Sequence, residues 1–212
     1  MAKKRVYAYI DGSNFYHLSK SNFKITKVQY NHLTNYLIDA TSEELARIKY
    51  YVAPVNQQEK PEMYSAQQKF FDMLRRTPLL DIGLGKLASR PLNKINIVCP
   101  DCGIQEAEEL QCPSCENKVR LSNTYKTSEK GVDVNLAIHL LLDALKNRYD
   151  VALIFSSDAD FCPAIRYIIK ELGKEVIYCR FPYPKTNELI QTCSDTRVIT
   201  RNMIEASQVN NH

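Results

Sequence analysis

Acidic residues follow two apolar stretches of the chain, at the points where those stretches end. The apolar run at 151–155 gives way to the sequence SSDAD at 156–160. The alternating stretch at 5–10 closes on Asp11, shortly before Asn14. Carboxylates without an adjacent Lys or Arg cost electrostatic energy unless a cation or a proton accompanies them. These residues therefore predict a cation-binding function at the ends of both stretches.

A third acidic position, Asp133, lies in the segment TSEKGVD at 127–133. If the apolar runs are strands of a parallel sheet, their carboxyl ends open on one side, so Asp11, Asp133, Asp158 and Asp160 can converge. Oxygen ligands favour Mg²⁺ or Mn²⁺, and Asn14 or Ser157 can orient a bound water. Such a site can activate water and stabilise the charge that develops during in-line attack on a phosphodiester. The sequence thus predicts Asp11, Asp133 and Asp158 as metal ligands.

Each acid also has a structural interpretation, which the sequence leaves open. Asp11 and Asn14 can cap a helix that begins close behind them. Asp133 can complement the dipole of the helix it begins. Asp158 is the first choice for direct metal contact, whereas Asp160 either acts through water or caps the next helix.

Strands and helices are expected to alternate around these positions. Strands are predicted at 5–10, 48–53, 79–87, 151–155 and 175–179, with an edge strand at 197–200. Helices are predicted from Phe15, at 28–40, 61–76, 127–146, 161–172, 187–192 and 202–206, with a helical turn at 43–47. The order predicts an α/β fold, a three-layer α/β/α sandwich with a mainly parallel central sheet.

The helix predicted to begin at Thr127 or Ser128 has an apolar stripe that we expect to face the core. Its members are Val134, Ala137, Ile138, Leu141, Leu142 and Leu145. His139 and Asp143 share another face of this helix.

Two C-x-x-C pairs, Cys99 with Cys102 and Cys112 with Cys115, interrupt the α/β rhythm at 91–125. Four thiolates at this spacing suit a structural Zn²⁺ site, and a zinc ribbon is predicted. A redox dithiol pair is the weaker alternative, because it does not account for both pairs. A segment this short cannot bury a core, so the metal would supply its folding energy.

Charge and composition restrict the class of protein. With 212 residues, 44% apolar and 25% charged, the chain can bury a full core, and its net charge of +4 permits an anionic partner without requiring one. The basic start at 3–5 precedes a strand rather than a signal-type apolar segment, and no apolar run approaches the length of a membrane span. We predict a cytoplasmic protein that does not enter a membrane.

Basic residues flank the cysteine segment on both sides. They are Lys86, Arg90 and Lys94 before it, and Arg120, Lys126 and Lys130 after it, with Tyr125 among them. Such cations bind phosphates without sequence preference, and an aromatic ring can stack on unpaired bases. The predicted substrate-binding residues are Tyr125, Lys126, Lys130, Ser156 and Ser157. An ordinary solvated surface is the alternative.

Three blocks of the sequence, in order and across nearly the whole chain, resemble the NYN domains of the PIN-like nuclease superfamily, especially the bacterial LabA-like branch. The blocks are YIDGSNFYH, EKGVDVNLAIHLLLDAL and VALIFSSDADFCPAIRYIIKELGKEVIYC. SSDADF is similar to that family's S-G-D-x-D-F, and KGVDV to its K-G-x-D element. Some relatives also carry a cysteine-bearing insertion ahead of K-G-x-D. Ser157 departs from the usual Gly, and His139 stands where many relatives have another acid.

The resemblance implies a PIN-like fold and metal-dependent ribonuclease chemistry that leaves a 5′-phosphate and a 3′-hydroxyl. It implies Asp11, Asp133, Asp158 and Asp160 as the acidic site, with Asn14 supporting it. Residues 1–90 and 126–206 would form the NYN domain, residues 91–125 the zinc-ribbon insertion, and residues 207–212 a disordered tail.

We therefore predict an endoribonuclease that uses Mg²⁺ or Mn²⁺ for catalysis, contains a structural Zn²⁺ and acts on single-stranded RNA. Two other functions stay open: a catalytically silent adaptor that binds RNA or protein through the ribbon, and a phosphohydrolase acting on nucleotides. A homodimer, or a protein partner bound through the ribbon, also stays open.

Overall fold

The structure, a computed structural model, describes residues 2–58, 60–91, 95–99, 103–107, 109–120 and 125–209. The chain divides into two compact units. The first comprises the residues up to Gly85 and those from Gly131 onward, and the second comprises Lys86–Lys130. The second unit is longer at both ends than the predicted insertion at 91–125.

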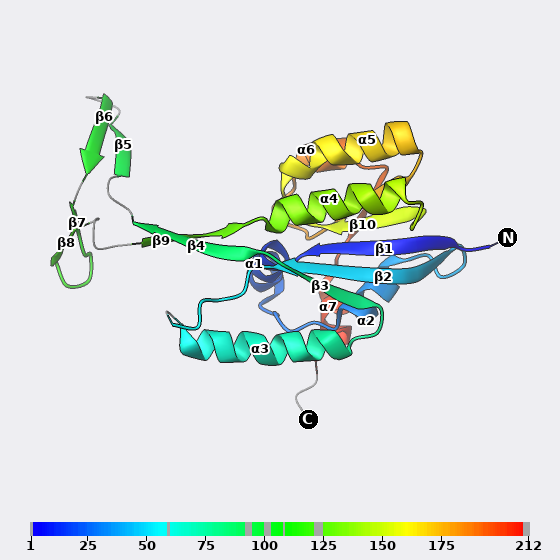
Figure 1. The fold of residues 1–212 in the computed structure, drawn as a ribbon, viewed down its shortest axis with the longest axis horizontal. Coiled ribbons are helices and arrows are strands. Elements are labelled where there is room, and N and C mark those ends of the chain that lie inside the picture. Colours follow the sequence, from blue (N-terminus) through cyan, green and yellow to red (C-terminus); the bar gives the residue numbers. More distant parts are fainter. Residues whose placement is uncertain are drawn as a thin grey trace. The chain divides into compact units, whose positions relative to one another are not determined.

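A six-stranded sheet with all neighbouring strands parallel forms the centre of the first unit (Figure 1). Its order is β12-β11-β10-β1-β2-β3. The strands are β1 (Lys4–Asp11), β2 (Glu43–Val52), β3 (Leu80–Leu84), β10 (Val151–Phe155), β11 (Glu175–Arg180) and β12 (Asp195–Val198). Each of the five residues of β10 is buried, as expected of a central strand covered on both faces.

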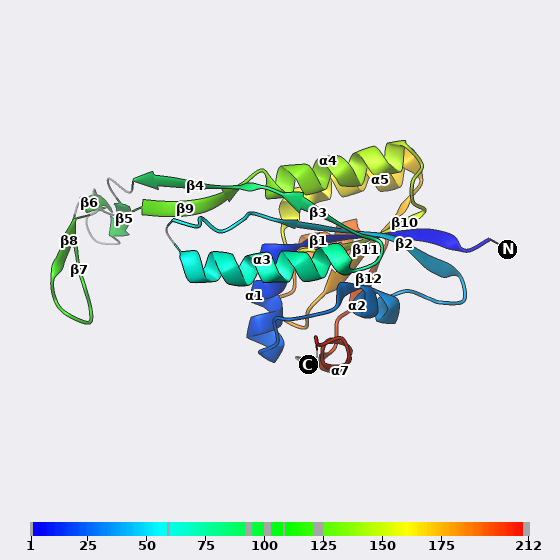
Figure 2. The ribbon, with the colours of Figure 1, turned by 60° about the horizontal axis from the view of Figure 1, so that its bottom comes forward.

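Helices cover both faces of this sheet (Figures 1 and 2). On one face lie α4 (Val132–Leu145), α5 (Cys162–Leu172) and α6 (Asn187–Thr192). On the other lie α1 (Gly12–Phe23), α2 (Tyr30–Leu37), α3 (Pro61–Arg76) and α7 (Arg201–Ala206). The predicted three-layer α/β/α fold with a mainly parallel sheet is confirmed.

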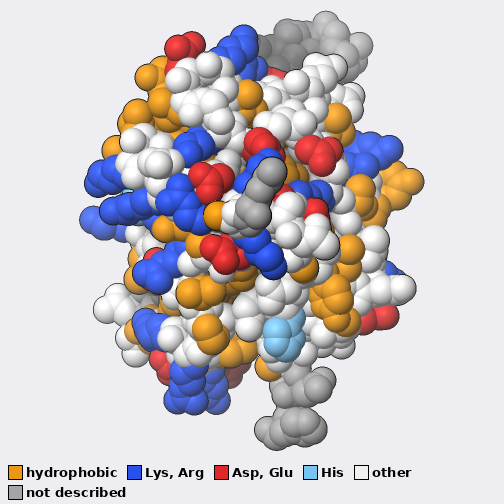
Figure 3. Space-filling model, turned by 90° about the vertical axis from the view of Figure 1, so that its right-hand side faces the viewer, with side chains coloured by type: hydrophobic (Ala, Val, Ile, Leu, Met, Phe, Trp, Pro, Cys, Tyr) orange, Lys and Arg blue, Asp and Glu red, His pale blue; other side chains and the backbone are white. Residues whose placement is uncertain are grey.

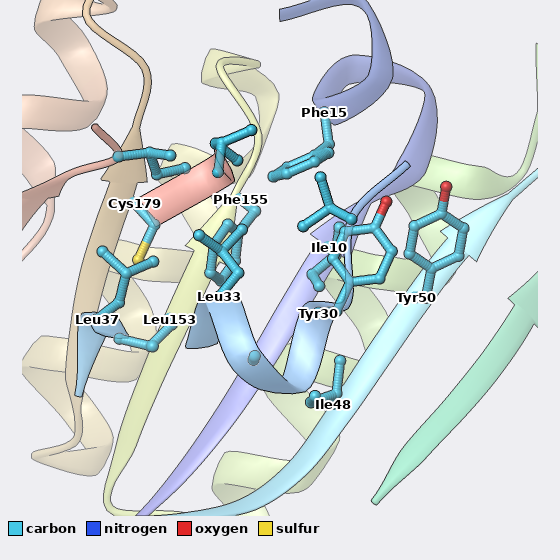
Figure 4. Packing of buried hydrophobic residues seen from close by; sticks show 14 of the residues in the cluster. Ile10, Phe15, Tyr30, Leu33, Leu37, Ile48, Tyr50, Leu153, Phe155 and Cys179 are labelled. Atoms are coloured by element: carbon cyan, nitrogen blue, oxygen red, sulfur yellow. The ribbon is translucent and has the colours of Figure 1, made fainter. Parts of the chain in front are cut away.

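Aromatic and aliphatic side chains from the sheet, α1 and α2 form the main core (Figure 4). Phe15 packs edge-on against Tyr30 with ring centroids 5.2 Å apart, and Tyr30 lies 5.1 Å from Tyr50. A Cβ at position 12 would lie 2.4 Å from the Tyr50 ring. Gly12 therefore lets α1 begin directly after β1, which places Asp11 at the first turn of that helix.

Three predicted elements differ from the structure. Residues 43–47 are not a helical turn but the first half of β2, because Glu43 and Glu44 pair with Lys4 and Arg5 of β1. The predicted strand at 79–87 divides at Gly85 into β3 and a strand of the second unit. The helix predicted from Thr127 or Ser128 begins instead at Val132, after Gly131 at a φ of 78°. In the first and third cases strand pairing overrides local propensity.

Helix α4 turns a different face to the core from the one its sequence predicts. The buried residues are Val132, Leu136, Leu140, Asp143 and Ala144. The predicted core stripe points away, since its members Val134, Ile138, Leu142 and Leu145 are exposed. The prediction of a core-facing stripe is therefore wrong. Because α4 is apolar on both sides, hydrophobic spacing alone cannot choose which side packs on the sheet.

Three antiparallel ribbons make up the described part of the second unit. Strand β4 (Lys86–Pro91) pairs with β9 (Tyr125–Lys130), β5 (Ile95–Cys99) with β6 (Gly103–Ala107), and β7 (Glu109–Gln111) with β8 (Lys118–Arg120). Thr127 and Ser128, predicted to begin a helix, pair with Ser89 and Ala88 in the first ribbon.

The chain stays ordered beyond the predicted start of a disordered tail. Ser207 is fully buried, and its carbonyl oxygen accepts a hydrogen bond from the N–H of Gln29 at 2.7 Å. Gln208 bridges Val28, so the prediction is wrong for 207–209. The rest of the predicted tail, 210–212, lies outside the described residues.

Opposite charges are interspersed at the amino edge of the sheet, the end of the molecule seen in Figure 3. Arg5 donates to both carboxylate oxygens of Asp150 at 3.0 Å, and these hydrogen bonds hold the pKa of Asp150 well below its ordinary value. Lys4 pairs with Glu175 at the same edge. No helix within the described ranges is long and apolar enough to cross a membrane.

The Asp143 carboxylate anchors α4 to the sheet. It is 1% exposed and accepts hydrogen bonds from the Tyr9 hydroxyl at 2.7 Å, from Arg148 at 2.9 Å and from Lys49. We predict that Asp143→Ala lowers the free energy of unfolding by about 3–5 kcal/mol, because it leaves the Lys49 ammonium largely buried without its carboxylate. Urea denaturation followed by circular dichroism measures this loss.

The matched control is Asp72→Ala, which removes an exposed ion pair with Arg75 within α3. It should cost less than about 1 kcal/mol, since exposed pairs contribute little. Equal losses in the two variants would contradict an anchoring role for Asp143.

Candidate active site

Asp11 ends β1 at the carboxyl edge of the sheet and is 6% exposed. Its Oδ1 accepts a hydrogen bond from the N–H of Asn14 at 3.0 Å, so it caps α1. Its Oδ2 accepts one from the Ser156 hydroxyl at 3.1 Å. The capping interpretation of Asp11 is therefore confirmed, and the same carboxylate also joins the loop that follows β10.

Asn14 links the loops after β1 and β10. Its side-chain oxygen accepts a hydrogen bond from the Ser157 N–H at 3.1 Å, and its Nδ2 donates to the Ser157 hydroxyl at 3.0 Å. The Thr186 hydroxyl, from the loop after β11, donates to the Ser157 carbonyl oxygen at 2.8 Å. The first turn of α1 and the loop after β11 therefore fix the backbone just ahead of Asp158.

Asp158 caps a short 3₁₀ turn, Ala159–Phe161, which leads into α5. Its Oδ1 accepts a hydrogen bond from the N–H of Asp160 at 2.9 Å, while its own N–H donates to the Ser156 hydroxyl at 3.2 Å. Capping in this segment thus comes from Asp158, and Asp160 is exposed at the rim.

Asp133 lies in the first turn of α4 and is electrostatically coupled to the same acids. Loss of hydration raises the pKa of its carboxyl group, and the negative charges of Asp158 and Asp160 raise it further. The helix dipole favours the ionised carboxylate at this position, but it does not offset these two effects. The edge therefore carries a negative potential that a cation would relieve.

The donor set suits a hard divalent cation. Within the described part of the chain, no three His, Cys, Asp or Glu side chains lie close enough together to hold a metal ion. Mg²⁺, however, is usually held by one or two carboxylates, with waters and substrate phosphates completing its octahedron. Asp133 and Asp158 fit that pattern. The three-acid ligand set of Asp11, Asp133 and Asp158 stays a prediction.

Sequence reasoning missed two residues of this edge. Arg180 ends β11, and its Nε is buried without a hydrogen-bond partner in the described structure. Like Asp11, Arg180 stands at the end of an apolar run in the sequence, and this pattern could have identified it as a candidate site residue. Thr186 had no signal, because only the folded loop brings it to Ser157.

His139 lies on the flank of α4 that faces β2. Its Nδ1 is 2.9 Å from the Tyr51 hydroxyl, to which it is hydrogen-bonded.

The sequence profile of the NYN domain matches residues 5–200, which is most of the chain. The chain belongs to the NYN domain family. Members of this family are typically nucleases that act on RNA and usually depend on a divalent metal. The NYN assignment therefore supports a nuclease role.

The NYN fold recurs in a crystal structure of a protein of unknown function from Vibrio parahaemolyticus. The two chains are 16% identical, and their superposition covers 93% of this chain and 94% of the other with a TM-score of 0.58. At this identity the likeness concerns the fold alone. Among curated proteins, none matches this NYN domain significantly.

Cys112 and Cys115 lie on one tight turn of the second unit, and both are free thiols. Hydrogen bonds from the backbone at Ser114 and Cys115 lower the pKa of the Cys112 thiol. A turn that favours the Cys112 thiolate suits a soft metal ion. The backbone of Cys99 ends β5, but its side chain and the whole of Cys102 lie outside what is described. The four-thiolate zinc site stays a prediction.

The predicted RNA contacts of the second unit lie on β9. Lys130 pairs with Lys86, Lys126 with Arg90 and Tyr125 with Pro91, all through the backbone. The side chains of Tyr125 and Lys126 are outside the described set, so their role as substrate contacts stays a prediction.

The acidic cluster predicts a measurable coupling. Asp158→Asn removes one negative charge near Asp133, so the pKa of Asp133 should fall but stay above its ordinary value, because the loss of hydration persists. A pH titration of the carboxyl carbon resonances by NMR measures this change. Asp72→Asn, an exposed substitution on α3, is the control and should leave Asp133 unaffected. An unchanged pKa in Asp158→Asn would rule out the coupling.

Proposed function

We propose that this NYN domain is a metal-dependent endoribonuclease whose active site lies at the carboxyl edge of the sheet. The observation that carries the proposal is the gathering of acids at this edge, where the Ser156 hydroxyl contacts both Asp11 and the Asp158 N–H. The raised pKa of Asp133 beside Asp158 and Asp160 supports it. Acids whose charges destabilise one another are typical of functional sites, and a bound cation would remove the penalty. Family membership supports the same class of activity.

Asp133 and Asp158 would hold Mg²⁺ or Mn²⁺ directly, Asp11 would complete the acidic set, and Asp160 would act through water. Such an ion supplies activation of water and stabilisation of the charge that develops on the phosphodiester. Side chains of the protein hold the acidic residues in fixed positions. The Ser156 hydroxyl contacts both Asp11 and the Asp158 N–H, so it holds the two acidic loops together.

Asn14 would act as a positioning residue. Its side chain occupies both the N–H and the hydroxyl of Ser157, which keeps the backbone before Asp158 in one conformation. Arg180 would attract the phosphates of the substrate electrostatically, because it ends the strand next to β10. Its buried Nε and its Nη1, which donates to the Phe181 carbonyl oxygen at 3.2 Å, hold the guanidinium in place rather than contact the substrate.

The proposed substrate is single-stranded RNA, which Lys126, Lys130 and Tyr125 of the second unit would contact through phosphates and a stacked base. The proposed compartment is the cytoplasm, because two C-x-x-C pairs in one short segment are typical of metal sites in reducing environments.

The proposal predicts metal-dependent cleavage of RNA. Incubation of a single-stranded RNA with the full chain and Mn²⁺ should give fragments with 5′-phosphate and 3′-hydroxyl ends. Asp158→Asn should lower the rate by at least about 100-fold, since losing even a residue that supports a metal ligand costs 10–100-fold. Gel analysis of end-labelled RNA measures the rate. Asp72→Asn is the matched control and should keep full activity.

A second readout does not depend on activity. Mn²⁺ should broaden the NMR signals of the segments around residues 133 and 158 in the wild type, and much less in Asp158→Asn. RNA that binds but is not cleaved would favour the adaptor function instead. Phosphate release from small phosphomonoesters without RNA cleavage would favour a phosphohydrolase.

We further propose that Cys99, Cys102, Cys112 and Cys115 bind one structural Zn²⁺. Elemental analysis should find a zinc ion per chain, and Cys112→Ser should lower that content, because a four-thiolate site loses a ligand. Chelation should make residues 86–130 sensitive to protease while the first unit keeps its circular dichroism spectrum. A zinc-free chain whose second unit resists protease would contradict the proposal.

A further inference from the structure

The outer side of α4 is an apolar stripe that no described segment of the first unit covers. Val134 is 60% exposed, Ile138 48%, Leu142 40% and Leu145 52%, and Leu141 is half-buried beside them. Their spacing of three and four residues places them in one row along the helix. The exposed fractions of Val134, Ile138, Leu142 and Leu145 together correspond to two fully exposed aliphatic residues.

This stripe lacks the charges that a solvent-facing helix normally carries. Between Val134 and Leu145 the one charged residue is Asp143, which is 1% exposed and bonded to the sheet side. The neighbouring helix α5, by contrast, exposes Arg166, Lys170 and Glu171 around Tyr167 (Figure 1). A helix that is apolar on all sides is normally buried on all sides. An apolar centre with a polar rim is the usual composition of a protein interface.

We propose that the outer stripe of α4 is a dimer interface, at which α4 packs antiparallel against α4 of a second copy of this chain. The row is self-complementary in that direction. An axis midway between Val134 and Leu145 brings each of these residues opposite the other in the partner copy, and brings Ile138 opposite Leu141 and Leu142 opposite Ala137. Because the row carries no charge, two copies meet without like-charge repulsion, as a two-fold interface requires.

The size of the surface is consistent with a moderate dimer. Helix α4 has 14 residues and is therefore about 21 Å long, and packed helices lie about 8–10 Å apart. The stripe alone is smaller than the roughly 800 Å² per partner of a standard interface. Tyr167, 48% exposed on α5, and the charged rim beside it would supply the remaining area. Association in the micromolar range is expected.

Sedimentation velocity of the full chain from 1 to 100 µM should show a monomer–dimer equilibrium. Val134→Glu and Leu145→Lys should each raise the dissociation constant at least about 30-fold, because each sets an unpaired charge against the apolar row of the partner copy. The double variant should regain dimerisation, because antiparallel packing sets each new Glu against the new Lys of the partner copy. Both charges also suit the dipole of their end of α4, so folding is preserved.

Met63→Glu is the matched control, since Met63 is 56% exposed on α3 at the opposite face of the sheet, and it should leave dimerisation unchanged. A wild type that stays monomeric at 100 µM would overturn the proposal. So would a double variant that stays as weak as the single ones. A different result would show that the second unit covers α4 instead. In that case residues 86–130 of monomeric Val134→Glu would be cleaved by protease faster than those of the monomeric wild type.

Discussion

The parallel pairing of β1 with β10 is the constraint on which the rest of the site depends. Ile10 lies beside Phe155, so Asp11 and Ser156 are the next residues on adjacent strands. Their hydrogen bond, and the contacts of Asn14 with Ser157 just beyond, follow from that register. A shift of one residue would exchange the side chains that the two faces bury, and side chains of different size do not fit each other's positions in a close-packed core. Core packing therefore positions the polar loops.

The amino and carboxyl edges of the sheet differ electrostatically. Helix α4 presents Asp133 at the carboxyl edge, and Asp143 anchors the same helix to the sheet. At the amino edge, Arg5 neutralises Asp150, whereas at the carboxyl edge Asp133 has a raised pKa beside two further acids. Asp143, in the last turns of α4, is held by Lys49 and Tyr9 of the sheet. Because a helix is rigid over this length, anchoring its carboxyl end also fixes where its amino end presents Asp133. Repulsion among the acids lowers the stability of the domain, and contacts elsewhere in the domain offset this loss.

Most of the fold, and the positions of Asp11 and Asp158 after β1 and β10, could be predicted from the sequence. Apolar runs that end on Asp11 and Asp158 indicate parallel strands whose ends meet, and the structure confirms the fold. The errors arise where long-range pairing decides the outcome. Glu43 and Glu44 are strand residues because β1 pairs with them, and Thr127 and Ser128 because β4 does. Thr186 reaches Ser157 through a tertiary contact that has no local pattern, whereas Arg180 closes an apolar strand as Asp11 does.

The inverted helix α4 shows why its orientation was not predictable from hydrophobicity. Its inner face contains an ionised residue, Asp143, and its outer face contains none, which is the reverse of an ordinary surface helix. The buried ion pairs select the inner face, because Asp143 can be satisfied only against Lys49 and Tyr9. The outer leucines then contribute nothing to the monomer's core. Substitutions on the inner face should therefore act on the stability of the domain, and those on the outer face on what the domain binds.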